Sequence, residues 1–235
     1  MKTYPPGKLP HDVLAHLLSK HTRSTDPRLR VGPGIGEDAA VIDFGDVCLV
    51  AKTDPITFAT DQIGWYAVHV NANDIAAMGA TPRWFLSTVI VPESMATADL
   101  FEDILSQIDA ACASLGVSVA GGHTEITTGI DRPIVVGQML GEVSSGRVIR
   151  SSGLRPGDAI LLTKGLAIEA TSILARQMKA HLQGRGWDDA ELDTATAYLT
   201  SPGISVVADA RIALQAGDVH ALHDPTEGGV ATALL

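Results

Sequence analysis

Four short polar segments in the first 125 residues carry the side chains that could do chemistry. They are GPGIGEDAAVI (residues 32–42), TDP (53–55), NANDIAAMGA (71–80) and GGHTE (121–125). Each places acidic or amide side chains beside small residues, within otherwise apolar sequence. Glycine lets backbone N–H groups approach phosphate oxygens closely, and carboxylates hold Mg²⁺, which in turn holds phosphate. Together the segments predict one shared site for a polyanion and its metal ions.

The first two segments supply acids at the edges of predicted strands. Gly34 and Gly36 precede the acid pair Glu37 and Asp38, and a strand follows. The segment is not a dinucleotide fingerprint, which needs a strand before it and a helix after it, nor a P-loop, which needs Gly-Lys-Ser/Thr. A simple glycine turn explains it equally well. Asp54 ends the predicted strand 47–53, where α/β-type sites collect ligands, although a turn aspartate is the alternative.

The other two segments add amides, an imidazole and further carboxylates. Asn71 and Asp74 are three residues apart and share one face of the predicted helix 63–80, at a cost in helix propensity. A solvated helix face is the alternative. GGHTE follows the short strand 117–120 and offers His123, Thr124 and Glu125, with a tight hairpin turn as the alternative.

The remaining polar residues form weaker patterns. The other histidines show no metal-ligand spacing, and we expect them at the surface or satisfied in the core. Asp224 and Thr226 in DPTEGG (224–229) either cap a helix or help its N-terminus to bind an anion. The period of two in the strand 47–53 places Lys52 and Thr53 on opposite sides.

Composition excludes several classes of function. The chain has 235 residues, 46% of them apolar, and a net charge of −10. The negative charge argues against a nucleic-acid surface and an anionic membrane surface. The N-terminus lacks the apolar region of a secretion signal, and no window holds 18 apolar residues, so we expect a cytoplasmic protein. Cys48 and Cys112 lie in apolar runs and are expected to be buried free thiols.

The predicted elements mix strands and helices without strict alternation, which favours the α+β class. We expect helices at 12–20, 63–80, 97–115, 167–182 and 203–216, and strands at 47–53, 84–91, 117–120, 133–143, 159–163 and 218–223. The segment 151–158 has the Gly, Pro and Ser content of a boundary, which divides the chain into domains 1–150 and 151–235. The chain stops in the first turns of a helix, so we expect a fragment of a longer protein whose second domain is truncated.

The motifs GIGEDAAVI, TD, NDIAAMGA-P, GG-x-T, LRPGD and DPTEGG occur in the order that resembles the aminoimidazole ribonucleotide (AIR) synthetase superfamily. That superfamily includes the purine enzyme, thiamine-monophosphate kinase, selenophosphate synthetase and the hydrogenase-maturation protein HypE. The resemblance implies a two-domain, PurM-like α+β protomer. It also implies a homodimer whose N-terminal strands form a shared barrel, with ATP and Mg²⁺ bound in a groove at that interface.

The resemblance also implies roles for individual residues. The metal–phosphate carboxylates would be Glu37, Asp38, Asp54 and Asp74. The nucleotide would be lined by Gly34, Gly36, Asn71, Gly121, Gly122 and Thr124. The catalytic residues would be Asp54, Asp74 and His123. The family's related motifs have Asp or Asn where this chain has His123, so either Glu125 substitutes as a ligand or this position contacts substrate.

The motifs after residue 120 resemble HypE-like chains most closely, which implies ATP-dependent dehydration of a carbamoylated acceptor and a maturation partner protein. The segment 63–87 resembles thiamine-monophosphate kinase instead, and that kinase is the alternative. Selenophosphate synthetase is disfavoured because no early cysteine lies in a glycine-rich loop, and the purine enzyme because its GGETAE-like motif is only partly matched. A non-catalytic nucleotide-binding or scaffold homologue is the alternative of another class, favoured by His123.

Overall fold

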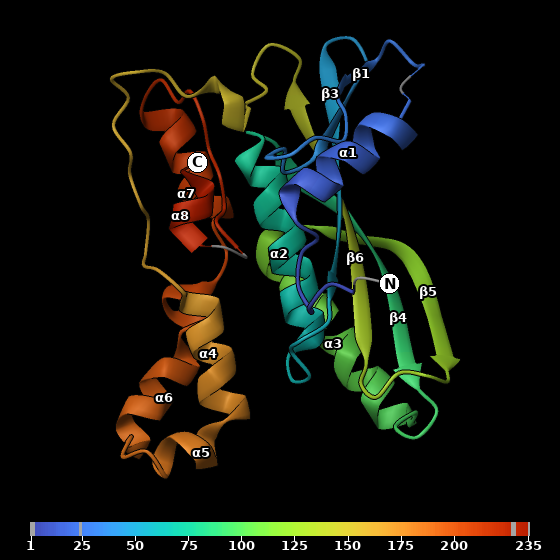
Figure 1. Ribbon diagram of the computed structural model, residues 1–235, viewed down its shortest axis with the longest axis vertical. Coiled ribbons are helices and arrows are strands. Elements are labelled where there is room, and N and C mark those ends of the chain that lie inside the picture. The colour runs from blue at the N-terminus through green and yellow to red at the C-terminus, as the bar shows by residue number, and fades with distance from the viewer. Residues whose placement is uncertain (1–2, 24, 227–228, 235) are drawn as a thin grey trace.

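A six-stranded mixed sheet lies on one side of the molecule, opposite the helices of residues 168–233 (Figure 1). The computed structural model describes residues 3–23, 25–226 and 229–234. The strands are β1 (Leu29–Val31), β2 (Ala40–Asp43), β3 (Val47–Ile56), β4 (Thr81–Pro92), β5 (Ser118–Thr127) and β6 (Ile134–Ser144). Their order is β1-β2-β3-β6-β4-β5, and only the β4–β5 pair is parallel. The α+β class is therefore confirmed.

The helices fall into two groups along the chain. The first group is α1 (His11–His21), α2 (Ile63–Ala77) and α3 (Ala98–Leu115). The second is α4 (Ile168–Gln177), α5 (Lys179–Gln183), α6 (Asp189–Ala197), α7 (Val207–Ala216) and α8 (Gly229–Ala233), with short helical turns at Ser151–Gly153 and Leu199–Gly203. The predicted helix 167–182 is thus two helices, because the α4 hydrogen bonds end at Met178.

Two glycines of β6 let α2 pack very closely on the sheet. A Cβ atom at Gly137 would lie 2.3 Å from Asn71 Nδ2, and one at Gly141 would lie 2.4 Å from Ile75 Cγ2. Gly64 makes the same kind of approach to α3, since its Cβ would meet the Ile104 carbonyl oxygen at 2.5 Å. Because α2 is buried on nearly all sides, its polar residues must find hydrogen-bond partners inside the protein.

The predicted helix 97–115 is confirmed together with both of its ends. The Thr97 side chain accepts a hydrogen bond from the Leu100 N–H at 3.2 Å, which satisfies one free donor of the first turn. Gly116 ends the helix with φ +67°, a conformation that suits glycine. Ile104 and Ile108 lie on the buried face, as the spacing of the apolar residues predicts.

Both strands predicted in the second half of the chain are wrong, since neither 159–163 nor 218–223 is a strand. Residues 154–166 follow an extended path to α4 instead (gold in Figure 1). Leu161 is 87% exposed there. A strand needs a neighbour for its backbone hydrogen bonds, and no described strand lies beside this segment.

Two strands of the first half, β3 and β5, extend beyond their predicted ends and include candidate site residues. β3 continues to Ile56, so Asp54 lies within the strand rather than at its end. β5 includes the whole of GGHTE, so these residues belong to the strand and form neither a turn nor a segment that follows it.

The second group of helices is joined to α2 by polar contacts. Arg176 of α4 donates to the Tyr66 hydroxyl at 2.6 Å and to Asp61 Oδ2 at 2.5 Å. Asn73 of α2 donates to the Ile204 carbonyl at 2.9 Å and accepts from the Val206 N–H at 2.8 Å. These bonds fix the segment before α7 against α2.

The expectation for the two cysteines is confirmed, whereas the expectation of a surface or satisfied histidine is wrong for His69, which is buried with neither ring nitrogen hydrogen-bonded among the described residues. Cys48 and Cys112 are free thiols, exposed by 0% and 2%. Within the described ranges, none of the helices combines the length and the apolar composition that crossing a bilayer requires.

Candidate functional site

Lys52, Asp54 and Asp74 meet where β3 passes α2. Lys52 and Asp54 are two residues apart on β3 and therefore share one side of the strand. Lys52 Nζ lies 3.0 Å from Asp74 Oδ1 and 3.2 Å from Asp54 Oδ2. Burial alone would lower the pKa of Lys52, but the two carboxylates raise it above its usual value, so the ammonium stays charged.

Asp38, His223 and Asp224 form a second group beside the first. Each offers one ligand atom, and these atoms lie within 4.8 Å of one another. His223 Nδ1 is 3.0 Å from Asp38 Oδ1, and this hydrogen bond raises the pKa of the imidazole against the opposing effect of burial. The expectation of a surface or satisfied histidine holds for His223, which is paired with Asp38. The structure also places it in a group that sequence spacing does not reveal, because its partner Asp38 is distant in sequence.

The two groups together hold more carboxyl groups than basic side chains. We call Asp38, Asp54, Asp74 and Asp224 the acidic cluster. Burial raises the pKa of Asp74 to about 7, with Lys52 opposing the shift. Burial raises the pKa of Asp224 to about 9, and the charges of Asp74 and Asp38 add to the effect. The cluster thus crowds four carboxyl groups around two basic side chains, Lys52 and His223, and this crowding opposes their full ionisation.

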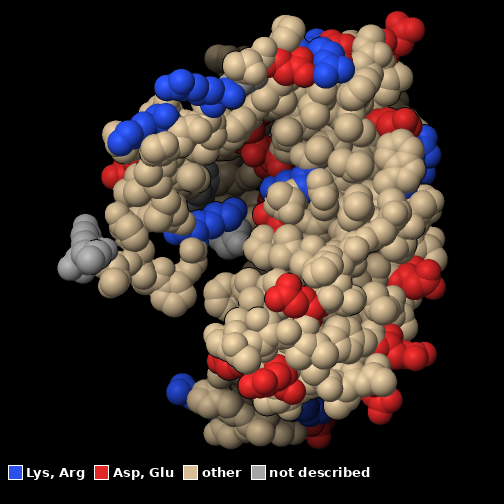
Figure 2. Space-filling view, turned by 90° about the vertical axis from the view of Figure 1, so that its right-hand side faces the viewer, with Lys and Arg blue, Asp and Glu red and all other residues tan. Residues whose placement is uncertain are grey.

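Asp224 gives a separate sign that the cluster suits a cation. Its side chain is 8% exposed, and its Oδ2 atom is buried without a hydrogen-bond partner among the described residues. A buried carboxylate oxygen without a partner is costly, and a divalent cation would satisfy it. Figure 2 shows acidic and basic side chains together inside a hollow on one face of the molecule.

Asn71 holds the backbone of Asp54 and is not exposed to a ligand. Its side chain is fully buried, accepts from the Asp54 N–H at 2.9 Å, and donates to the carbonyls of Asp54 and Ala67 at 3.3 and 2.8 Å. The amide therefore pairs with the peptide groups of β3 and α2. Its predicted contact with nucleotide stays a prediction, whereas its position fixes where the Asp54 carboxylate can lie.

The glycine loop before β2 lies at the edge of the acidic cluster. Gly34 and Gly36 are exposed, and Gly36 has φ +80°. Asp38 points into the cluster, but Glu37 is paired with Arg150, and its Oε2 atom is buried without a hydrogen-bond partner among the described residues. The metal-ligand role of Glu37 stays a prediction.

The GGHTE segment lies away from the acidic cluster within one protomer. Asp54 pairs with Gly137, Gly137 with Ser87, and Ser87 with Gly122. Asp54 and Gly122 are therefore three strand spacings apart, about 14 Å. The described structure therefore does not bring His123 next to Asp54 or Asp74.

The residues of β5 are exposed on both sides. The His123 side chain is 66% exposed, and its Nε2 atom is 3.7 Å from Glu125 Oε2. Thr124 is exposed as well. Gly122 lets β5 approach β4 closely, because a Cβ at Gly122 would lie 2.1 Å from the Ser87 carbonyl oxygen. The predicted roles of His123, Thr124 and the Gly121-Gly122 pair at nucleotide are therefore not supported by contacts within one protomer.

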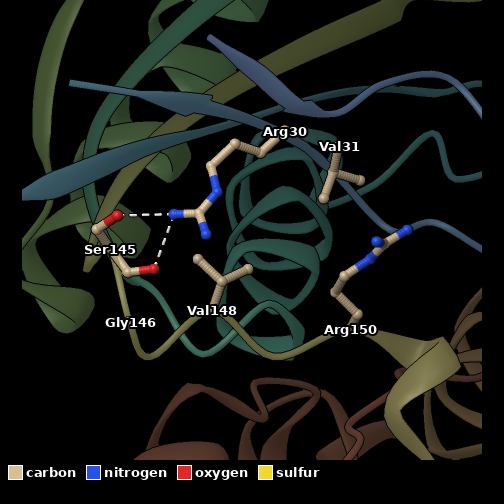
Figure 3. A pocket seen from close by; sticks show the side chains of 6 residues that line it. All are labelled: Arg30, Val31, Ser145, Gly146, Val148 and Arg150. Atoms are coloured by element: carbon tan, nitrogen blue, oxygen red, sulfur yellow. Dashed lines mark hydrogen bonds between the residues drawn. The ribbon is translucent and has the colours of Figure 1, made fainter. Parts of the chain in front are cut away.

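A cavity of about 230 Å³ beside β1 is a separate place. It is lined by Arg30, Val31, Ser145, Gly146, Val148 and Arg150 (Figure 3). Arg30 Nη1 donates to the Ser145 carbonyl and hydroxyl at 2.8 and 2.7 Å, and Arg150 is paired with Glu37. Both guanidinium groups are thus engaged within the protein, and none of the lining residues belongs to the acidic cluster.

Sequence reasoning missed Lys52 and His223 as members of the site. For Lys52 a signal was present, since the period of two that separates it from Thr53 also places it beside Asp54. For His223 the chain itself offered none, because Asp38 lies 185 residues away. Asp224 was considered only as a helix cap or an anion contact.

Comparisons with known proteins identify what the chain is similar to. Residues 36–143 match the family model "AIR synthase related protein, N-terminal domain", and residues 155–235 match the C-terminal domain of the same family. A putative hydrogenase expression/formation protein of Methanocaldococcus jannaschii is 28% identical over 97% of this chain and 66% of its own length. A selenide, water dikinase of Rhizobium meliloti is 31% identical over 95% of this chain and 61% of its own.

A solved structure shows a similar sequence identity. Hydrogenase maturation protein HypE in complex with ATP is 28% identical, with a TM-score of 0.62, over 97% of this chain and 64% of that protein. The chain thus spans less than two thirds of the length of each of these relatives.

Proposed function

Because the chain belongs to the AIR synthase-related superfamily, we propose that it binds ATP with Mg²⁺ at the acidic cluster and supports phosphoryl transfer to an oxygen of an acceptor. The observation that carries the proposal is the crowding of four carboxyl groups in that cluster, with Asp224 Oδ2 buried and without a hydrogen-bond partner among the described residues. Positioning and charge neutralisation supply most of the catalysis in phosphoryl transfer, and this cluster is built for both.

The donors in the cluster fit a hard divalent cation. Asp38, Asp74 and Asp224 would hold Mg²⁺ through carboxylate oxygens, which are the ligands it prefers. When bound, Mg²⁺ neutralises charge on the phosphates. His223 orients the Asp38 carboxylate through its hydrogen bond. The exposed backbone around Gly36 is free to approach phosphate oxygens.

For the acceptor we propose the HypE-like reaction, ATP-dependent dehydration of a carbamoylated group presented by a maturation partner protein. The similarity to the archaeal hydrogenase expression/formation protein and to ATP-bound HypE supports it. Thiamine-monophosphate kinase remains the second candidate, because the segment that contains α2 resembles that enzyme most closely. Both cysteines are buried, so neither thiol is placed to meet a substrate.

We also propose that a second copy of the chain covers β5, as the superfamily's shared barrel implies. β5 is an edge strand exposed on both sides, including Val119 at 50% and Ile126 at 57%, although parallel strands are normally buried. Light scattering in solution tests this. A dimer that Val119→Lys converts to a monomer supports the proposal, and a monomeric wild-type chain contradicts it.

A calorimetric titration of the whole chain with ATP tests the site. We expect binding in Mg²⁺ that disappears in EDTA, and absence of binding in both would contradict the proposal. Asp74→Asn should abolish this binding and leave the thermal midpoint without ATP nearly unchanged. Turnover assays then separate the acceptors: phosphorylation of thiamine monophosphate identifies the kinase, and ATP binding without any turnover identifies a non-catalytic homologue.

A further inference from the structure

Lys52 occupies the place in the acidic cluster where a bound cation would bridge two elements. Its ammonium contacts one carboxylate from β3, Asp54, and one from α2, Asp74, at 3.2 and 3.0 Å. The Lys52 side chain is 18% exposed and the Asp74 side chain 8%. Carboxylate oxygens that converge on one point attract either an ammonium or a metal ion, so the two compete for the same atoms.

Lys52 is the basic side chain that pairs with the carboxylates of Asp54 and Asp74. Among the described residues no other Lys or Arg lies within 4.0 Å of Asp54 or Asp74. One ammonium balances only one of two ionised carboxylates, and the carboxyl groups of Asp38 and Asp224 lie beside them. A divalent cation therefore competes with Lys52 for Asp74 while the cluster as a whole still attracts it.

The lysine can move without any change in the backbone. Its Cα is fixed by β3, which pairs with β2 and β6 on either side and is held by Asn71 at Asp54. Its ammonium sits at the end of a flexible four-carbon stem with three rotatable donors. The end of the side chain can thus leave Asp74 for a nearby phosphate oxygen at the cost of side-chain rotation alone.

We propose that Lys52 is a built-in counter-cation that couples metal binding to nucleotide binding. In the metal-free protein the ammonium bridges Asp54 and Asp74. A divalent cation displaces it from Asp74, and the phosphate groups of the nucleotide then accept the displaced ammonium. Metal alone binds weakly because it must displace a charge partner, and metal with nucleotide binds cooperatively. The inference rests on the proposed function, since it requires a metal–nucleotide site at the acidic cluster.

Mn²⁺ binding by the whole chain, followed by calorimetry and by the loss of the free Mn²⁺ electron paramagnetic resonance signal, tests the inference without any activity assay. Lys52→Met removes the charge and keeps the length of the side chain. Without nucleotide we expect the variant to bind Mn²⁺ at least about tenfold more tightly than wild type, because one unit charge about 3 Å from the ligand oxygens is gone. Adding a non-hydrolysable ATP analogue should raise the Mn²⁺ affinity of the wild type. In Lys52→Met the same addition should change Mn²⁺ affinity by a factor close to one.

Lys164→Met is the matched control. The Lys164 side chain is 20% exposed, similar to that of Lys52, but it contacts the carbonyls of Gly203 and Ser205 and the carboxylate of Asp209, outside the acidic cluster. Its removal should leave Mn²⁺ affinity unchanged. Lys52→Gln repeats the test with a neutral polar side chain, should the methionine variant not fold.

The outcomes separate this inference from the proposed function. If wild type binds Mn²⁺ with nucleotide and the Lys52 variants bind Mn²⁺ no more tightly than wild type, the inference is wrong and the site stands. If wild type binds neither Mn²⁺ nor the nucleotide analogue, the proposed function is wrong, and the inference falls with it. Tighter Mn²⁺ binding by both Lys52 variants, with the Lys164 control unchanged, supports the inference.

Discussion

Replacing Asn71 with alanine tests whether α2 positions Asp54 through its backbone. The side chain accepts from the Asp54 N–H at 2.9 Å and donates to the Ala67 carbonyl at 2.8 Å, inside a fully buried contact. Truncation removes both strong bonds and opens a gap above Gly137. A buried polar group left without a partner costs about 1–3 kcal/mol. Because two such groups are affected, we expect a loss of about 2–6 kcal/mol in the free energy of unfolding, measured with urea.

Asn73→Ala is the matched control for this prediction. Asn73 lies on the same helix and also binds two backbone groups, but these belong to Ile204 and Val206. Both variants should lose comparable stability. Only Asn71→Ala should also weaken Mg²⁺-dependent ATP binding, by at least about tenfold, a loss of about 1.4 kcal/mol. A stability loss below about 1 kcal/mol, or an equal loss of ATP affinity in both variants, would refute the positioning role of Asn71.

Three further predictions test other parts of the account. Burial raises the pKa of Asp224 to about 9, above its unfolded value, so the metal-free protein should lose stability as pH rises from about 4 towards 9. Asp224→Asn should flatten this loss in urea unfolding in EDTA between about pH 5 and 8, and an unchanged slope would contradict it. Gly122→Ala places a Cβ 2.1 Å from the Ser87 carbonyl oxygen and should destabilise the protein by more than about 2 kcal/mol. Gly129→Ala, with φ +82° and open space around the added Cβ, should cost less stability. Equal losses in the two variants would show that backbone conformation, rather than the contact with Ser87, sets the stability cost. Thr97→Ala removes the cap of α3 and should lower stability by about 1 kcal/mol in thermal unfolding, and no change would mean that the cap is not used.

Elements with a strong local signal could be predicted from the sequence. The helix after Thr97 has a capping residue, a regular apolar spacing and a terminal glycine, and all three appear in the structure. The segment 159–163 has the composition of a strand, yet Leu161 is 87% exposed. Composition describes what a segment prefers, whereas a strand also requires a neighbour, which local sequence does not encode.

The acidic cluster could be predicted only in part. Asp38, Asp54 and Asp74 are close to glycine or alanine and stand out in their local sequence, and the structure brings them near one another. His223 joins them from 185 residues away, and no local pattern reveals a contact of that separation. Asn71 and Asn73 have a low propensity for helix interiors, which correctly indicates that their side chains have a specific role. Their hydrogen bonds to buried backbone groups explain that role without a ligand.

The central claim is that the acidic cluster is a Mg²⁺-dependent ATP site, and isothermal calorimetry of the whole chain tests it most directly. ATP is titrated into the wild-type protein and into Asp74→Asn, each in Mg²⁺ and in EDTA. The account predicts saturable binding by wild type in Mg²⁺ alone and no binding by the variant, with both proteins folded. ATP binding that persists in EDTA, or that Asp74→Asn leaves unchanged, would contradict it.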